Sequence, residues 1–277
     1  MITPLPPSAP RWLVLPLLLG LAAALPLQAA FPNLGELTDK LKKVEGTASK
    51  VGQVVKGASG LTLEEEIAVG DAVALEIVRR FGGLWRDEAA TVRVNTLGKA
   101  LARYADRQDL NWRFALLASD TVNAYSAPGG RVFITRGLYQ KLDTDDRLAG
   151  VLGHEIEHID RRHAVKIIAR GEFLSGVNAL VSERSSDFAQ FDKAISEVTT
   201  LLLEKGFDHG TEFEADQHGR NLAQVTGFAP GGLRAVLVQL RKDGGGKAAK
   251  EVFSTHPPLD ERLKRLPTDP EPPAPTR

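Results

Sequence analysis

The chain has 277 residues with 35 basic and 35 acidic side chains, a formal net charge of zero, and no cysteine. Because charges of both signs are mixed along the chain, the composition argues against a surface for nucleic acid or anionic membrane. The lack of cysteine excludes a disulfide framework and a lipid anchor on an N-terminal cysteine. The length is sufficient for one compact domain with its own hydrophobic core.

The N-terminal segment has the pattern of a secretory signal peptide. Residues 12–30 carry no charge, and the small residues Ala29 and Ala30 precede a polar chain. This predicts cleavage near Ala29 and export to a bacterial periplasm. The uncharged run is also just long enough to span a bilayer, so an uncleaved inner-membrane anchor is the alternative. Pro16 and Pro26 interrupt the helical part and favour cleavage.

Composition divides the rest of the chain into three parts. Residues 30–60 are rich in Lys, Gly, Ala and Ser, which predicts a flexible segment or a weak amphipathic helix. Residues 61–267 are expected to form the folded domain, and the proline-rich residues 268–277 a disordered tail.

Hydrophobic periodicity predicts a mostly helical α+β domain with one small sheet. The expected helices cover residues 62–81, 88–107, 143–169, 188–203, 211–225 and 231–241. The expected strands cover residues 112–119, 122–127 and 131–135, with a turn at 128–130. A cleft is expected between the sheet and the helices. Residues 171–210 are expected to contain a mobile loop over it, most polar at 182–187.

The helix predicted over residues 143–169 carries the pattern His-Glu-x-x-His at 154–158. Side chains four residues apart share a helix face, so His154 and His158 can bind one metal ion. Glu155 is placed to take a proton from a water on that metal. The alternative is a solvated face with two histidines by coincidence, and it is disfavoured because the same helix has an apolar face.

A catalytic zinc usually has three protein ligands and one open position, which predicts a third ligand downstream. Glu212 and Asp216 lie four residues apart at the start of the next candidate helix. We assign Glu212 as the ligand and Asp216 as the acceptor that orients a ligand histidine. The alternative is an acidic first turn favoured by the helix dipole, with Thr211 as its N-cap.

Four blocks of sequence together resemble a known family. They are residues 122–138, residues 148–158 with 162–164, residues 212–216, and residues 255–258 with Arg262. In type, order and spacing they resemble the HtpX-like and CAAX-prenyl-protease-like zinc metallopeptidases, gluzincins whose third ligand is a downstream glutamate. The resemblance is strongest to periplasmic BepA-like members, without a tetratricopeptide domain. It implies a zincin-type metallopeptidase domain over residues 61–267, binding one Zn²⁺ through His154, His158 and Glu212.

The resemblance also bears on the predicted hairpin. A sheet edge beside a zinc site can hold an extended peptide through main-chain hydrogen bonds. The family pattern favours this role for Asn123, Ala124, Tyr125, Ser126 and Ala127. A purely structural hairpin is the alternative.

The sequence leaves two alternative roles for His256 and for Arg262, and predicts a structural role for His163. The resemblance implies that His256 reaches the metal, either as a reversible inhibitor in the open position or as a group that stabilises the oxyanion. Arg262 is expected either to pair with a carboxylate near the site or to lie solvated on the surface. His163 falls on another face of a continuous helix, which predicts a structural role.

These features predict a zinc-dependent endopeptidase that hydrolyses unfolded or misfolded cell-envelope proteins, with Glu155 as the base. A latent zinc-binding chaperone or assembly factor is the main alternative, and a metal-free scaffold ranks last because every expected ligand is present. Peripheral contact with membrane or outer-membrane assembly machinery is a further expectation, and no nucleic-acid partner is expected.

Overall fold

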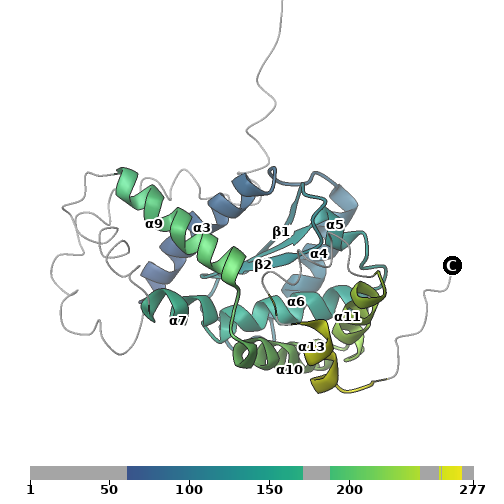
Figure 1. Ribbon diagram of the computed structural model, residues 1–277. Coiled ribbons are helices and arrows are strands. Elements are labelled where there is room, and N and C mark those ends of the chain that lie inside the picture. Colours follow the sequence, from purple (N-terminus) through teal and green to yellow (C-terminus); the bar gives the residue numbers. More distant parts are fainter. Residues whose placement is uncertain (1–60, 171–187, 244–255, 257, 270–277) are drawn as a thin grey trace, which may run out of the picture.

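The structure is a computed structural model that describes residues 61–170, 188–243, 256 and 258–269 (Figure 1). The expected signal peptide, the segment at 30–60, the polar loop at 182–187 and the tail beyond residue 269 lie outside the described residues. Within the described ranges, none of the helices combines the length and the apolar character needed to span a bilayer.

The described elements run in chain order from the N-terminal side of the domain to its C-terminal helix. They are α3 (Leu63–Arg80), α4 (Glu88–Ala102), β1 (Arg113–Leu117), β2 (Ala124–Ala127), β3 (Arg131–Thr135), α5 (Arg136–Tyr139), α6 (Asp145–Asp160), α7 (His163–Arg170), α9 (Phe188–Thr200), the π-helix η2 (Leu201–Lys205), α10 (His209–Val225), α11 (Gly232–Lys242) and α13 (Leu259–Arg265). The predicted α+β architecture, mostly helical with one small sheet, is confirmed.

Strand β3 lies at the centre of the sheet, parallel to β1 and antiparallel to β2. All of its residues are buried. Val132 and Ile134 face a core shared with α4, α6 and α11, while Phe133 faces a second core shared with α3 and α7. A strand covered on both faces reads as a continuous apolar run. The strand order leaves β2 at an edge of the sheet, against α6 (Figure 1).

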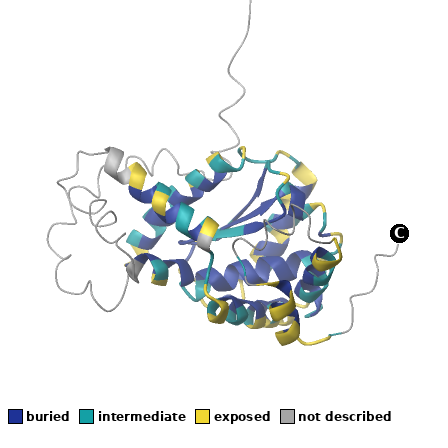
Figure 2. Ribbon diagram, viewed as in Figure 1, coloured by how far each residue is buried: buried dark blue, intermediate teal, exposed yellow. Residues whose placement is uncertain are grey.

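Helix α6 is the central helix of the domain, and every residue from Leu148 to Ile159 is buried (Figure 2). Its start follows from the sequence, because the side chain of Thr144 caps the amide of Arg147 and two aspartates occupy the first turn. Its neighbours are the sheet and α4 on one side and α10 and α11 on the other.

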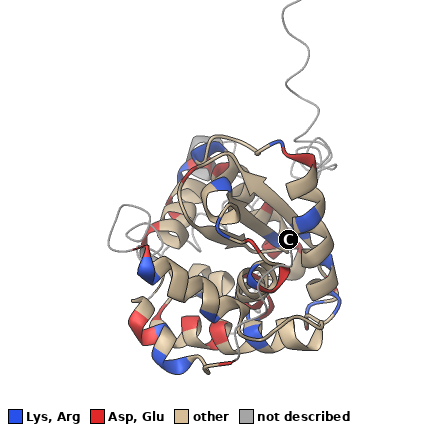
Figure 3. Cartoon of the chain, turned by 90° about the vertical axis from the view of Figure 1, so that its right-hand side faces the viewer, with Lys and Arg blue, Asp and Glu red and all other residues tan. Residues whose placement is uncertain are grey.

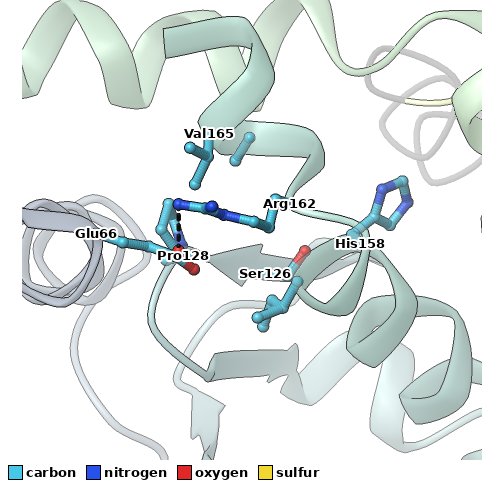
Figure 4. A pocket seen from close by; sticks show the side chains of 9 residues that line it. Glu66, Ser126, Pro128, His158, Arg162 and Val165 are labelled. Atoms are coloured by element: carbon cyan, nitrogen blue, oxygen red, sulfur yellow. Dashed lines mark ion pairs between the residues drawn. The ribbon is translucent and has the colours of Figure 1, made fainter. Parts of the chain in front are cut away.

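The single helix predicted over residues 143–169 is wrong, because the chain turns between α6 and α7. Arg162 has a left-handed φ of 55°. Its Nη2 lies 3.0 Å from Oε2 of Glu66, which is fully buried on α3. Figure 4 shows this ion pair. A left-handed conformation is costly for a residue with a side chain, so surrounding contacts must support it. The turn redirects the chain just after the candidate ligands.

Glycines set the spacing between α6 and α10. A Cβ atom on Gly153 would lie 2.6 Å from the carbonyl oxygen of Gly219, and one on Gly219 would lie 2.6 Å from the amide nitrogen of His154. Neither contact is sterically possible, so glycine at both positions lets the two backbones approach closely. This crossing brings α10 against α6 (Figure 1).

Other predicted boundaries need smaller corrections. The helix predicted to reach residue 107 ends at Ala102, where the side-chain amide of Gln108 donates to the carbonyls of Ala102 and Ala105. Those bonds satisfy carbonyl groups that a longer helix would have used. The short helices α5 and α13 were not predicted, and α9 continues into the π-helix η2.

Basic and acidic side chains are interspersed over the helices seen in Figure 3. Two ion pairs of this kind tie down the C-terminal part of the described chain. Arg241 on α11 lies 3.2 Å from Asp260 on α13. Arg220 on α10 lies 2.8 Å from Asp269, within the segment predicted to be a tail.

Candidate metal centre and active site

Three predicted ligand side chains from two helices meet at one point. The Nε2 atoms of His154 and His158 are 3.1 Å apart. Glu212, in the first turn of α10, places Oε2 3.6 Å from His154 Nε2 and Oε1 3.5 Å from His158 Nε2. All three residues are at most 3% exposed.

These distances suit a zinc ion. Ligand atoms bound to one tetrahedral zinc at about 2.0–2.2 Å lie roughly 3.3–3.6 Å from one another. The two histidine nitrogens are 3.1 Å apart, and each lies 3.5–3.6 Å from one of the two carboxylate oxygens of Glu212, close to that range. Among the described residues, Oε1 of Glu212 is buried and has no hydrogen-bond partner. A buried carboxylate oxygen without a partner needs a cation or a donor, and a metal ion at this point would supply the cation.

Glu155 is also buried, at 3% exposed, and follows His154 along α6. Together with His154 it lines a cavity that is also lined by Ala124, the first residue of β2, and by Asn123 just before it. The carboxylate therefore borders a space between the candidate ligands and the edge strand.

A buried ion pair supports His154 from behind. Asp216 Oδ1 lies 3.0 Å from His154 Nδ1, on the ring side opposite Nε2. Arg262 on α13 donates to both carboxylate oxygens of Asp216, from Nη2 at 2.5 Å and from Nε at 2.9 Å. Asp216 thus lies where the orienting acceptor was predicted. Arg262, whose place the sequence left open, is 2% exposed and paired.

The surroundings of His158 are different, and the sequence did not reveal them. Its Nδ1 lies 2.9 Å from Nδ1 of His163, and the ring of Phe207 stacks on it with centroids 4.2 Å apart. His163 Nε2 lies 3.4 Å from Oε2 of Glu214. The prediction that His163 lies on another face of a continuous helix is wrong, because the turn at Arg162 redirects the chain and brings the ring to His158.

His256 lies at the same cluster. Its Nδ1 is 2.7 Å from Oε2 of Glu212, and its ring centroid is 5.4 Å from that of His154. One donor atom from each of His154, His158, Glu212 and His256 lies within 4.8 Å of the others. The structure therefore brings His256 to the site, while its neighbours Thr255 and Pro257 lie outside the described residues.

Burial and neighbouring charges shift the pKa values of the two ligand histidines in opposite directions. Burial, with the positive charges of neighbouring histidines, holds the pKa of His158 well below its ordinary value. Burial and Arg262 also lower the pKa of His154, but the hydrogen bond and charge of Asp216 outweigh them and raise it. Burial raises the pKa of Glu212, yet the charge and hydrogen bond of His256 outweigh burial and lower it.

The expected substrate strand borders the site along its length. Asn123 and Ala124 line one cavity with Glu155, whereas Ser126 and Ala127 line a second cavity with His158. Figure 4 shows Ser126 and His158 on the walls of the second cavity. Tyr125 stacks on Phe81 of the segment that follows α3, with ring centroids 4.6 Å apart. β2 is therefore an edge strand that passes the candidate metal centre.

Comparisons with known proteins agree with this geometry. The chain is 28% identical over 214 residues to the beta-barrel assembly-enhancing protease of Yersinia pestis, covering 73% of this chain and 43% of that protein. Identity to the Escherichia coli K12 protein of the same name is 27% over 253 residues, 88% of this chain and 50% of the relative. The protease HtpX homolog of Salinibacter ruber is 26% identical over 259 residues, 78% of this chain and 90% of that protein.

The chain spans about half the length of the first two relatives. The pattern of one family, described as peptidase family M48, matches residues 88–269. That range contains all the candidate ligands, Glu155 and the edge strand, and it exceeds half of the 277 residues. The resemblance inferred from the four sequence blocks is confirmed, and the chain belongs to peptidase family M48.

Proposed function

We propose that the protein is a zinc-dependent endopeptidase that hydrolyses peptide bonds of unfolded or misfolded proteins of the cell envelope. One observation carries the proposal: the donor atoms of His154, His158 and Glu212 lie 3.1–3.6 Å apart next to Glu155. Two imidazoles and a carboxylate form a common donor set for catalytic zinc, and they leave one position open.

The residues around this centre would have distinct roles in hydrolysis. Zinc, when bound, lowers the pKa of a water and polarises the scissile carbonyl. Glu155 takes a proton from the attacking water as the carbon–oxygen bond forms, and delivers it to the amine nitrogen as the carbon–nitrogen bond breaks. Asp216 accepts a hydrogen bond from Nδ1 of His154, which leaves Nε2 of that ring free to bind the metal.

The edge strand supports a substrate class rather than a particular sequence. An extended peptide paired with residues 123–127 would be held through its main chain, which every unfolded protein offers. In a folded protein most main-chain groups are already hydrogen-bonded, so pairing with this strand generally needs local unfolding. This favours unfolded or misfolded chains as substrates.

The proposed location is the periplasm, and an uncleaved inner-membrane anchor is the alternative. The uncharged run at residues 12–30 supports export. Two relatives are named for enhancing β-barrel assembly, which supports an envelope role and peripheral contact with membrane or assembly machinery.

Casein cleavage by the zinc-loaded protein tests the activity. We expect Glu155→Gln to lower the rate by about 10²–10⁴-fold, because it removes the proton acceptor and keeps the shape of the side chain. Glu157→Gln is the matched control, since Glu157 lies on the same helix, pairs with Arg161 and is 7% exposed. Cleavage should persist in this control and stop with a chelator. Equal cleavage by wild type and Glu155→Gln would contradict the proposal.

A second candidate function is a latent zinc-binding chaperone or assembly factor. It is favoured by the bond of 2.7 Å between His256 and Glu212, which places an imidazole beside the three candidate ligands. In that position His256 can occupy the site that a substrate carbonyl needs, or it can stabilise the oxyanion once substrate has displaced it.

His256→Ala separates the two roles of this histidine. An inhibitory His256 predicts faster casein cleavage in the variant, by at least threefold. An oxyanion-stabilising His256 predicts a fall of about 10²-fold in kcat with KM little changed. A third outcome is that wild type and variant both bind zinc but neither cleaves casein. In that case the chaperone hypothesis replaces the peptidase hypothesis.

A further inference from the structure

A single buried carboxylate on α3 contacts three separate segments of the domain. Glu66 is fully buried, and its Oε2 lies 3.0 Å from Nη2 of Arg162 in the turn between α6 and α7 (Figure 4). Its Oε1 accepts a hydrogen bond of 3.1 Å from Nη1 of Arg107, in the segment before β1. The amide of Gly129, in the turn between β2 and β3, donates to the same oxygen at 3.4 Å. Removing this carboxylate would deprive two guanidinium groups of a buried counter-charge.

The contact with Arg162 acts on the point where the chain leaves the ligand helix. Arg162 has a φ of 55°, a conformation that is unfavourable for a residue with a Cβ atom. Its Nη2 also donates to the carbonyl oxygen of Leu61, just before the N-cap of α3. Both partners belong to the beginning of α3, so this part of the chain holds the side chain of the residue whose backbone is strained.

The left-handed residue directly precedes His163, whose ring supports a candidate ligand. Nδ1 of His163 lies 2.9 Å from Nδ1 of His158, while Nε2 of His158 points to the other ligand atoms. A continuous helix would carry His163 to another face, since residues five apart do not share one. The support of His158 therefore depends on the turn, and the turn depends on the carboxylate of Glu66.

Glu66 is also held from the side opposite Arg162. The amide of Arg107 donates to Oδ1 of Asp160 at 3.1 Å, and the amide of Asp106 donates to Oδ2 of the same carboxylate at 2.7 Å. Asp160 is the last residue of α6, so the ligand helix itself anchors the segment whose arginine binds Glu66. A carboxylate fixed in this way can hold Arg162 in one position.

We propose that Glu66 is a positioning residue for the metal centre, which sets the orientation of His158 through Arg162 and His163. The family match covers residues 88–269, so it assigns no role to α3. The proposal rests on the metal centre of the proposed function and is independent of its catalytic step. Groups that orient a metal ligand typically change metal affinity about 10–100-fold when they are removed.

Zinc binding by the full-length Glu66→Gln variant tests this role, with affinity measured by competition with a zinc-binding dye. Glutamine keeps the shape of the side chain but gives Arg162 no negative charge. We expect zinc binding to weaken about tenfold. The d–d absorption spectrum of the Co²⁺-substituted protein should also change, because the ring of His158 loses its fixed orientation. An unchanged affinity with an unchanged spectrum would overturn the proposal.

Asp71→Asn is the matched control, because it removes a second carboxylate of α3 from a largely buried pair. Asp71 lies 2.6 Å from Nη2 of Arg131 on β3, and its side chain is 14% exposed. The contacts described for this pair include neither Arg162 nor a candidate ligand. Urea unfolding should show a loss of stability in both variants, while zinc affinity and the cobalt spectrum change only in Glu66→Gln. Equal losses of zinc affinity in the two variants would show that Glu66 acts only through folding, and would overturn the proposal.

Combining Glu66→Gln with His163→Ala tests the route of the effect. If Glu66 acts through His163, the double variant should bind zinc as His163→Ala alone does, within about twofold. Losses that multiply in the double variant would show that Glu66 acts by a route other than His163, and would overturn the proposal while leaving the peptidase function intact. A wild-type protein that binds no zinc would instead refute the proposed function, and this proposal with it.

Discussion

The two histidines of the His-Glu-x-x-His pattern have different surroundings, although the pattern treats them alike. His154 has a carboxylate behind it, and that carboxylate is paired with a buried arginine. His158 has a second imidazole behind it and an aromatic ring stacked on its face. Charge supports one ligand, whereas a neutral ring and an apolar contact support the other.

The difference affects which nitrogen of each ring carries the proton and how firmly the ring is oriented toward a metal. An ionised Asp216 can only accept hydrogen bonds, so it fixes the proton of His154 on Nδ1 and leaves Nε2 as the ligand atom. His163 accepts a hydrogen bond only in its neutral form, when one ring nitrogen carries no proton. Its burial lowers its pKa to about 4, which keeps that form at neutral pH. The support of His154 should therefore be the stronger of the two.

The largest effect is expected from Asp216→Asn, which removes the charge behind His154. Arg262 would remain buried without its counter-ion, which costs about 3–5 kcal/mol in the free energy of unfolding. Zinc affinity should fall about 10–100-fold. Urea unfolding and competition with a zinc-binding dye measure the two quantities.

Asp120→Asn is the control for that substitution. Asp120 also pairs with an arginine, Arg136, but its side chain is 79% exposed. Exposed pairs of this kind contribute about 0–1 kcal/mol, so stability should change little and zinc affinity should not change. Similar losses of stability and zinc affinity in both variants would mean that the buried pair behind His154 contributes no more than an exposed pair does.

The ligands themselves were predictable because they follow from local geometry. A spacing of four residues places His154 and His158 on one helix face whatever the rest of the chain does. Glu212 and Asp216 repeat that spacing on a second helix, and zinc chemistry requires a third ligand. The strand at residues 131–135 was likewise predicted, because it follows a turn with one proline and two glycines.

The surroundings of the ligands depend on contacts between distant segments, which local patterns do not encode. The close crossing of α6 and α10 needs Gly153 opposite Gly219, and either glycine alone would be read as a weak position in a helix. The turn that brings His163 back to His158 depends on a left-handed Arg162, held by Glu66 from α3. An arginine in a sequence does not predict a left-handed backbone conformation.

On the other side of the comparison, His163→Ala should lower zinc affinity about tenfold and stability by about 1 kcal/mol. It removes one hydrogen-bond partner of His158 and no charge, so the cost is smaller than for Asp216→Asn. The d–d absorption spectrum of the Co²⁺-substituted protein should also change, because the ring of His158 loses its fixed orientation.

His163→Gln provides the rescue for that variant. Its side-chain carbonyl can accept a hydrogen bond from Nδ1 of His158, so zinc affinity should recover partly. If His163→Ala lost stability but kept its zinc affinity and its cobalt spectrum, His163 would be a packing residue rather than a positioning residue.

The smallest effect is expected from Glu214→Gln. This variant tests whether the carboxylate next to His163 contributes to metal binding. Glu214 Oε2 lies 3.4 Å from His163 Nε2, a long contact, and its side chain is 40% exposed. Water and salt screen a charge at that exposure, so zinc affinity should change by less than about threefold. A loss as large as that of Asp216→Asn would show that both histidines depend on buried charge, and the contrast between the two ligands would then disappear.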